Sequence, residues 1–242
     1  MEKSGESTLN QEEVDKFRAM SRLKPFLLPL YQSIIIDLRS TWWDPKGVCR
    51  PLHSMNRLRV PLVREGLLQE GTISEAFMET DKPLTGLKLL DVGCGAGLLS
   101  EPLARIGASV VGLDACKENI EAAREHLSLD PDLHERLSYQ CCTVEEHAEN
   151  LDGPCYDAIV ASEVIEHVDN PEIFLTKCSQ LVKPGGSIFV TTINRSTRSW
   201  LLAIVGAEYV LGLLPRGTHE WDKFVKPEEL GRLLEGRECA VR

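Results

Sequence analysis

Residues 88–97 read Lys-Leu-Leu-Asp-Val-Gly-Cys-Gly-Ala-Gly, five residues of strand type that run into a loop with three glycines. Glycine allows a backbone to approach a ligand closely and leaves its amide groups free to bind it. A dinucleotide fingerprint has the pattern GxGxxG, whereas here Gly97 comes one residue early and Leu98 stands in its usual place. Asp91, just before the loop, would repel a pyrophosphate but suits an amino group and a sulfonium. The stretch therefore favours S-adenosylmethionine over NAD, with a plain strand-to-helix turn capped by an aspartate as the alternative.

Strand and helix patterns alternate along the chain from this loop onward. Strands are predicted over 88–92, 109–114, 137–142, 158–162 and 187–192, helices over 98–106, 117–127 and 171–181, and a turn over 183–186. Such alternation is typical of an α/β fold with a parallel sheet and crossover helices. The second strand ends at Asp114, about twenty residues after Gly93, where a carboxylate can accept both hydroxyls of a ribose. NAD and S-adenosylmethionine sites share this spacing, so it supports a cofactor without choosing between them.

The residues before the first strand are predicted to form an extension. A polar tail leads into a helix over 11–21, and another helix is predicted over 58–68. Because residues 82–86 have the composition of a linker, we expect a tail with helical extension over 1–85 and a cofactor-binding domain over 86–242. Apolar residues gather over 200–214, within an insertion at 196–220, and are too few for the roughly 20 that a spanning helix needs. They predict either a buried helix or a membrane-facing lid.

Composition excludes several classes of protein. The chain has 242 residues, and its 27 Lys and Arg against 37 Asp and Glu give a formal net charge of −10. Because a polyanion needs clustered cations, a nucleic-acid partner is disfavoured. The eight cysteines contain no CxxC pair and no zinc-type spacing, so reduced, intracellular thiols are expected. The first ten residues show neither a secretory signal nor a transit peptide, which predicts a cytosolic protein or a missing targeting segment.

The motifs together resemble a known family. The loop Asp91–Gly97, Asp114, Glu163-Val-Ile-Glu-His-Val and Lys183-Pro-Gly-Gly resemble the class I S-adenosylmethionine-dependent methyltransferases, which have a Rossmann-like fold. More specific motifs resemble the ubiquinone-biosynthesis O-methyltransferases: Trp42-Trp-Asp, Lys46-Gly, Pro51-Leu-His, Asn56-Arg-Leu-Arg, Thr192-Ile-Asn-Arg, Val205-Gly-Ala-Glu-Tyr and Gly217-Thr-His. The similarity covers roughly residues 11–20 and 42–235.

The resemblance implies a reaction and a setting for it. The reaction is methylation of a catechol-type hydroxyl on polyprenylated ubiquinone precursors, namely a polyprenyl dihydroxybenzoate and a demethylubiquinol. The implied setting is the matrix face of the mitochondrial inner membrane, as a peripheral protein in a multi-protein biosynthetic complex. The expected cofactor contacts are Arg59, Asp91, Gly93, Gly95, Asp114 and Ser162. Arg59 suits the methionine carboxylate because a guanidinium binds carboxylate bidentately, and a solvated helix-face arginine is the alternative.

Glu163, Glu166 and His167 follow the fourth predicted strand. If a helical turn begins at Glu163, the three side chains share one face and could hold Mg²⁺, a role that the resemblance also implies. A capping glutamate with a packed histidine is the alternative. A phenol has a pKa near 10, so its anion must be stabilised at neutral pH. A metal could do this as a Lewis acid, or His167 could accept the proton as a general base.

Two stretches depart from the family pattern. Residues 22–40 form an apparent insertion, and the family's terminal hairpin, which completes a seven-stranded sheet, has no counterpart after residue 235. We therefore expect a truncated or alternative form without the C-terminal strands. Two further functions stay open at this point: methylation of another small molecule, for example on carbon, and a non-catalytic role in a lipid-biosynthesis complex.

Overall fold

The computed structural model describes residues 8, 10, 11, 14, 15, 42–47, 49–192 and 231. Its elements are, in chain order, α3 (Arg50–Gln69), β1 (Lys88–Val92), α4 (Ser100–Arg105), β2 (Ser109–Asp114), α5 (Lys117–Leu127), the 3-10 turn η1 (Pro131–Leu133), β3 (Leu137–Cys141), α6 (Val144–Glu149), β4 (Tyr156–Ser162), the 3-10 turn η2 (Ile165–His167), α7 (Pro171–Leu181) and β5 (Val182–Thr191). This alternation confirms the predicted α/β class.

The five strands form one parallel sheet in the order β3-β2-β1-β4-β5. β1 lies at the centre, with β2 on one side and β4 on the other. The chain therefore changes direction across the sheet between β1 and β4, and crevices at such a switch point bind ligands in open α/β sheets. The loops after these two strands, which begin at Gly93 and Glu163, open at the same edge.

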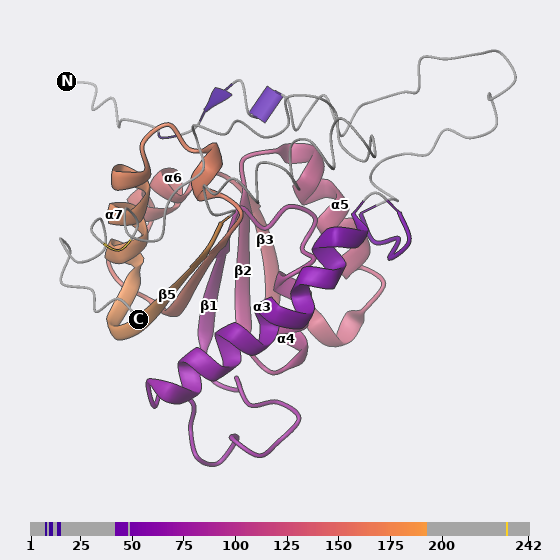
Figure 1. The fold of residues 1–242 in the computed structure, drawn as a ribbon, viewed down its shortest axis with the longest axis vertical. Coiled ribbons are helices and arrows are strands. Elements are labelled where there is room, and N and C mark those ends of the chain that lie inside the picture. The colour runs from indigo at the N-terminus through magenta and orange to yellow at the C-terminus, as the bar shows by residue number, and fades with distance from the viewer. Residues whose placement is uncertain are drawn as a thin grey trace, which may run out of the picture.

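Helices cover both faces of the sheet, with α3, α4 and α5 on one side and α6 and α7 on the other (Figure 1). Alternate residues of β1 supply the two cores: Leu89 packs toward α3, and Leu90 packs toward α7. Val63 and Leu67 of α3 belong to the same core as Leu89. Full burial of a leucine contributes about 1.5–3 kcal/mol, so α3 is held to the sheet by ordinary core packing.

Helix α3 begins earlier than the predicted helix over 58–68. Pro51 lies in its first turn, where the missing N–H costs no hydrogen bond. Asn56 donates from Nδ2 to the carbonyl oxygen of Leu98, 2.6 Å away, and so ties this part of the helix to the segment after the glycine loop.

Two features differ from the pattern expected in the second half of the domain. The predicted turn over 183–186 is a bulge inside β5, because Val182 pairs with Tyr156 and Ser187 already pairs with Ala158. Helix α6 was not predicted, although Thr143 and Glu146 form a reciprocal capping box at its start. The Thr-x-x-Glu spacing is the signal that could have indicated it.

Several expectations lie outside the described residues: the insertions over 22–40 and 196–220, most of the helix over 11–21, and any terminal strands. The seven cysteines that the structure describes are free thiols. Within the described part of the chain, no helix is both long enough and apolar enough to cross a membrane.

Candidate active site

The glycine loop after β1 is a tight turn whose positive φ angles favour glycine. Gly93, Gly95 and Gly97 have φ values of 70°, 55° and 84°. A Cβ on Gly93 would lie 2.3 Å from Cγ2 of Val164, and one on Gly97 would lie 2.0 Å from the hydroxyl oxygen of Tyr139. The loop is therefore packed closely between the segment after β4 and strand β3.

Asp114 ends β2 next to this loop, as predicted. Its Oδ2 accepts a hydrogen bond from the Gly95 amide at 2.9 Å. Its Oδ1 accepts from the Cys116 amide at 2.8 Å and from Nδ2 of Asn119 at 3.2 Å. Burial raises the pKa of Asp114, and these hydrogen bonds oppose the shift. The carboxylate is thus fixed against the loop, and its position joins the β1 and β2 ends into one site.

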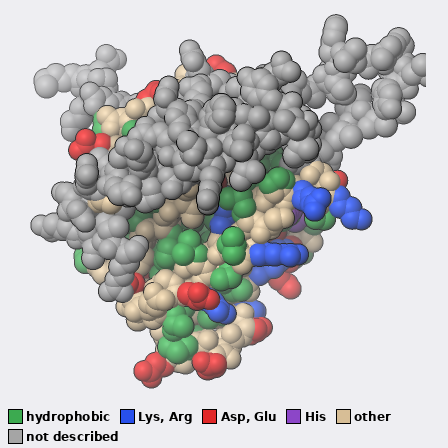
Figure 2. Space-filling view, in the orientation of Figure 1, with side chains coloured by type: hydrophobic (Ala, Val, Ile, Leu, Met, Phe, Trp, Pro, Cys, Tyr) green, Lys and Arg blue, Asp and Glu red, His purple; other side chains and the backbone are tan. Residues whose placement is uncertain are grey.

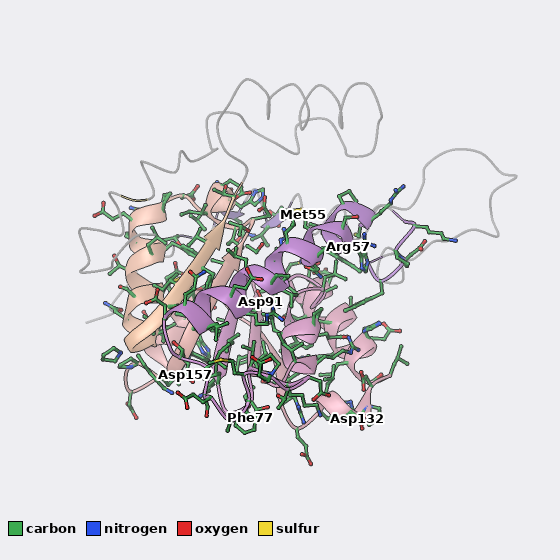
Figure 3. All side chains as sticks on the ribbon, turned by 60° about the horizontal axis from the view of Figure 1, so that its bottom comes forward. Met55, Arg57, Phe77, Asp91, Asp132 and Asp157 are labelled. Carbon is green, nitrogen blue, oxygen red and sulfur yellow. The ribbon has the colours of Figure 1, made fainter. Side chains whose placement is uncertain are left out.

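Asp91 lies beneath the loop rather than at an open mouth. Its side chain is buried, and Oδ2 accepts a hydrogen bond from Oγ of Ser100 at 2.5 Å. Burial raises the pKa of Asp91 to about 6, while the hydrogen bond and the nearby Arg59 lower it. Asp91 is thus a second, inward-facing charge of the site and lies under α3 (Figure 3).

Arg59 reaches the site from α3 and is buried, with 9% of its side chain exposed. Its NH2 group lies 3.8 Å from Oε1 of Glu163. Burial lowers the pKa of Arg59, and the nearby Glu163, Asp91 and Glu166 carboxylates raise it. Its Nε is buried and has no hydrogen-bond partner among the residues that the structure describes. The guanidinium therefore retains an unused donor beside the loop, and the solvated helix-face alternative does not describe its position.

Thr191, the last residue of β5, and Thr192, which follows it, hold the two glutamates that follow β4. Thr191 Oγ1 donates to Oε1 of Glu163 at 3.1 Å and lies 2.7 Å from Oγ of Ser162. Thr192 Oγ1 donates to Oε2 of Glu166 at 2.9 Å. The sequence analysis quoted Thr192 in a family motif but assigned neither threonine a role at the site, because that role depends on the pairing of β4 with β5.

Glu163 and Glu166 do not share a helical face as the sequence suggested. Glu163 has φ +56°, and the helical turn begins only at Ile165. The Glu163 amide instead donates to the Thr191 carbonyl oxygen at 2.8 Å. Adjacent strand pairing therefore takes precedence over the local helical pattern.

The two carboxylates nevertheless influence each other. Burial, and then the charge of Glu163, raises the pKa of Glu166 to about 7. Two neighbouring carboxylates are the donors that a hard cation prefers, so the chemistry of the pair fits Mg²⁺. In the ranges that the structure covers, no three His, Cys, Asp or Glu side chains are arranged to hold a metal, so His167 does not complete the set in this arrangement.

Comparison with known proteins agrees with this geometry. A sequence profile described as "Methyltransferase domain" matches residues 64–242. The chain is 51% identical over 204 residues to the mitochondrial ubiquinone biosynthesis O-methyltransferase of Rattus norvegicus, covering 84% of this chain and 58% of the rat protein. It is 47% identical over 197 residues to the ubiquinone biosynthesis O-methyltransferase of a Bradyrhizobium species, covering 81% of this chain and 74% of that protein.

The fold also matches a solved structure. Magnesium protoporphyrin IX methyltransferase from Synechocystis, crystallised with bound SAH, aligns with a TM-score of 0.57 at 18% identity, over 85% of this chain and 83% of that one. At that identity the match confirms the Rossmann-like methyltransferase fold and nothing finer. The chain spans less than two thirds of the length of the mammalian relatives that it matches. The family profile and the identities over most of the chain confirm the resemblance drawn from the motifs: this chain belongs to the ubiquinone biosynthesis O-methyltransferase family.

Proposed function

We propose that this chain binds S-adenosylmethionine at the glycine loop and transfers its methyl group to a catechol-type hydroxyl of polyprenylated ubiquinone precursors, a polyprenyl dihydroxybenzoate and a demethylubiquinol. The observation that carries the proposal is the buried Arg59 guanidinium, whose Nε is unpartnered within the described residues and which lies beside the loop. The names of the relatives support the substrate class.

Arg59, Asp114 and Asp91 each have a counterpart on the cofactor. Arg59 donates hydrogen bonds to the methionine carboxylate, since charge-assisted pairs of this kind are the strong ones. Asp114 accepts from the ribose hydroxyls, and Gly93 and Gly95 allow the cofactor to approach the backbone. Asp91, buried beneath the loop, attracts the amino group and the sulfonium through its charge and not by direct contact, while Ser162 is the last residue of β4.

The substrate hydroxyl must lose its proton to attack the methyl group. Mg²⁺, with Glu163 and Glu166 as its proposed ligands, would supply Lewis-acid stabilisation of the phenolate when bound. His167 accepts the proton if it acts as a general base. The sulfonium is already activated, so the remaining contribution of the site is to align oxygen, methyl carbon and sulfur.

We extend the proposal to the setting of the reaction. A polyprenyl tail is membrane-soluble, and the relatives in Rattus norvegicus and Mus musculus are named mitochondrial. The names support a mitochondrial location, and the lipid tail of the substrate favours a membrane surface. The proposed setting is peripheral attachment to the matrix face of the mitochondrial inner membrane, in a biosynthetic complex. The apolar stretch over 200–214 is the proposed contact with the bilayer, and it lies outside the described residues. Replacing Leu201, Leu202 and Leu211 with Ser should abolish liposome co-sedimentation, and unchanged sedimentation would exclude this contact.

Calorimetry with S-adenosylhomocysteine and with NADH tests the cofactor first. Binding of S-adenosylhomocysteine alone is expected, and binding of NADH alone would overturn the proposal.

Methyl transfer to a polyprenyl dihydroxybenzoate is then measured with and without chelator. Loss of activity in chelator and recovery with Mg²⁺ support the metal. Full activity in chelator, together with an inactive His167→Ala variant, would replace the metal by a general base.

A further inference from the structure

Trp42 lies against the glycine loop although it is distant from it in sequence. A Cβ placed on Gly95 would lie 3.3 Å from Cη2 and 3.5 Å from Cζ3 of the Trp42 ring. Gly95 is also the residue whose amide donates to Asp114. The indole therefore lies against the same loop residue that is hydrogen-bonded to the β2 carboxylate, and its side chain is only partly buried.

The segment around Trp42 is held in place from both sides. The Trp42 carbonyl oxygen lies 2.8 Å from Nε2 of His53 in α3. The next ring, Trp43, stacks on His126 of α5 with ring centroids 3.5 Å apart and planes at 5°. His126 Nδ1 in turn lies 2.6 Å from Oε1 of the buried Glu101 in α4.

These anchors attach the segment to α3 and to α5, and through His126 to α4. The helices α4 and α5 follow β1 and β2, the two strands that end in the proposed cofactor site. Asp44 closes the segment with a turn, because its Oδ1 accepts from the Lys46 amide at 2.9 Å and its carbonyl oxygen accepts from the Gly47 amide at 3.0 Å. A ring that is positioned by two helices and a turn, yet keeps part of its surface accessible, is arranged to contact something beside the loop.

We propose that Trp42 forms an aromatic wall of the cofactor site and packs against the adenosine part of S-adenosylmethionine, on the side of Asp114. The inference rests on the proposed function, because it names a binding residue of the same site. An indole offers a large, flat apolar surface to a nucleoside, and aromatic contacts of this kind contribute energy beyond the area they bury. Trp43 has a different role, since it attaches the wall to α5.

The test compares the affinity for S-adenosylhomocysteine of Trp42→Ala, Trp42→Phe and the wild type by calorimetry. Trp42→Ala is expected to weaken binding about tenfold, and Trp42→Phe to restore it to within about threefold, because the ring is retained. Phe77→Ala is the matched control: it removes another half-buried aromatic ring, on the side of the molecule opposite Met55 of α3 (Figure 3). Its affinity should equal that of the wild type.

A spectroscopic measurement separates contact from folding. The variant Trp43→Phe, Trp200→Phe, Trp221→Phe retains Trp42 as the sole tryptophan of the four. Saturating S-adenosylhomocysteine should change the emission of Trp42. Unchanged emission in a variant that calorimetry shows to be saturated, or equal affinity of Trp42→Ala and wild type, would overturn the inference. A wild type that does not bind S-adenosylhomocysteine would instead overturn the proposed function itself. If Trp42→Ala does not fold, the affinity of Trp42→Phe and the fluorescence of the single-tryptophan variant still test whether Trp42 contacts the cofactor.

Discussion

The NH2 group of Arg59, in helix α3, lies 3.8 Å from Oε1 of Glu163, which follows strand β4. Only 9% of the Arg59 side chain and 19% of the Glu163 side chain are exposed. Removing one partner of a buried ion pair is costly because the other charge stays buried without compensation. This pair links the N-terminal helix to the loop that follows β4. The helix that precedes the Rossmann-like sheet is therefore part of the site and not merely an extension of the chain.

Replacing Arg59 with Ala should weaken the binding of S-adenosylhomocysteine by about 10- to 150-fold, because hydrogen bonds to charged groups contribute about 1.5–3 kcal/mol. Isothermal titration calorimetry measures the change. Arg64→Ala is the control, since Arg64 is exposed on the outer surface of the same helix, where basic and hydrophobic side chains lie side by side (Figure 2). Equal losses in both variants would show that the effect comes from the helix and not from the guanidinium.

Gly93→Ala should abolish cofactor binding and lower the melting temperature by more than Gly71→Ala does. Both residues have φ near +70°, but a Cβ on Gly71 meets nothing within 4 Å, whereas one on Gly93 meets Val164. Gly71→Ala therefore isolates the backbone cost, about 1–2 kcal/mol. Adding Val164→Ala to Gly93→Ala should recover part of the stability. No recovery would mean that the collision with Val164 is not the cause.

The stability of the protein should fall as pH rises from about 4.5 toward 7, in part because of Glu166. Its pKa in the folded chain is raised to about 7, so the folded state keeps a proton that the unfolded chain has already released. The stabilisation is fully present below the unfolded pKa of about 4.3 and is lost as pH passes the folded pKa. Asp91, with a pKa raised to about 6, acts in the same direction.

Glu166→Gln should therefore be more stable than the wild type at pH 8 by up to about 3 kcal/mol, and about equally stable at pH 4. Denaturant unfolding at both pH values, in the presence of chelator, measures the difference. The glutamine oxygen can still accept the hydrogen bond from Thr192, which isolates the titration. An equal effect of the substitution at both pH values would exclude Glu166 as the titrating group.

Glu163→Gln should weaken Mg²⁺ binding at least tenfold, because one of the two neighbouring carboxylates loses its charge. Titration calorimetry with MgCl₂ alone measures it, and Glu149→Gln, an exposed position on α6, is the control. If Glu163→Gln and the wild type bind Mg²⁺ equally, the two glutamates do not hold the ion.

Much of the fold was predictable from local patterns. The bounds of β1, β2, α5 and α7 agree with the sequence analysis, because buried parallel strands and amphipathic crossover helices each have their own periodicity. The pairing of β5 around a bulge was not predictable, because it depends on the partner strand. The start of α3 was missed because its contact with Leu98 comes from another part of the chain.

The sequence by itself determined the cofactor loop, the place of Asp114 at the end of β2, and the family, because these depend on spacing and motifs within short, continuous stretches of the chain. Only the tertiary structure decided how the charges face one another. It buried Asp91 under α3, brought Arg59 within reach of Glu163, set Glu163 outside the helical turn, and placed Trp42 against Gly95. These relations join segments that are far apart in the chain. They are fixed by the packing of α3 and by the pairing of β4 with β5, and neither leaves a signal in the local periodicity of the sequence.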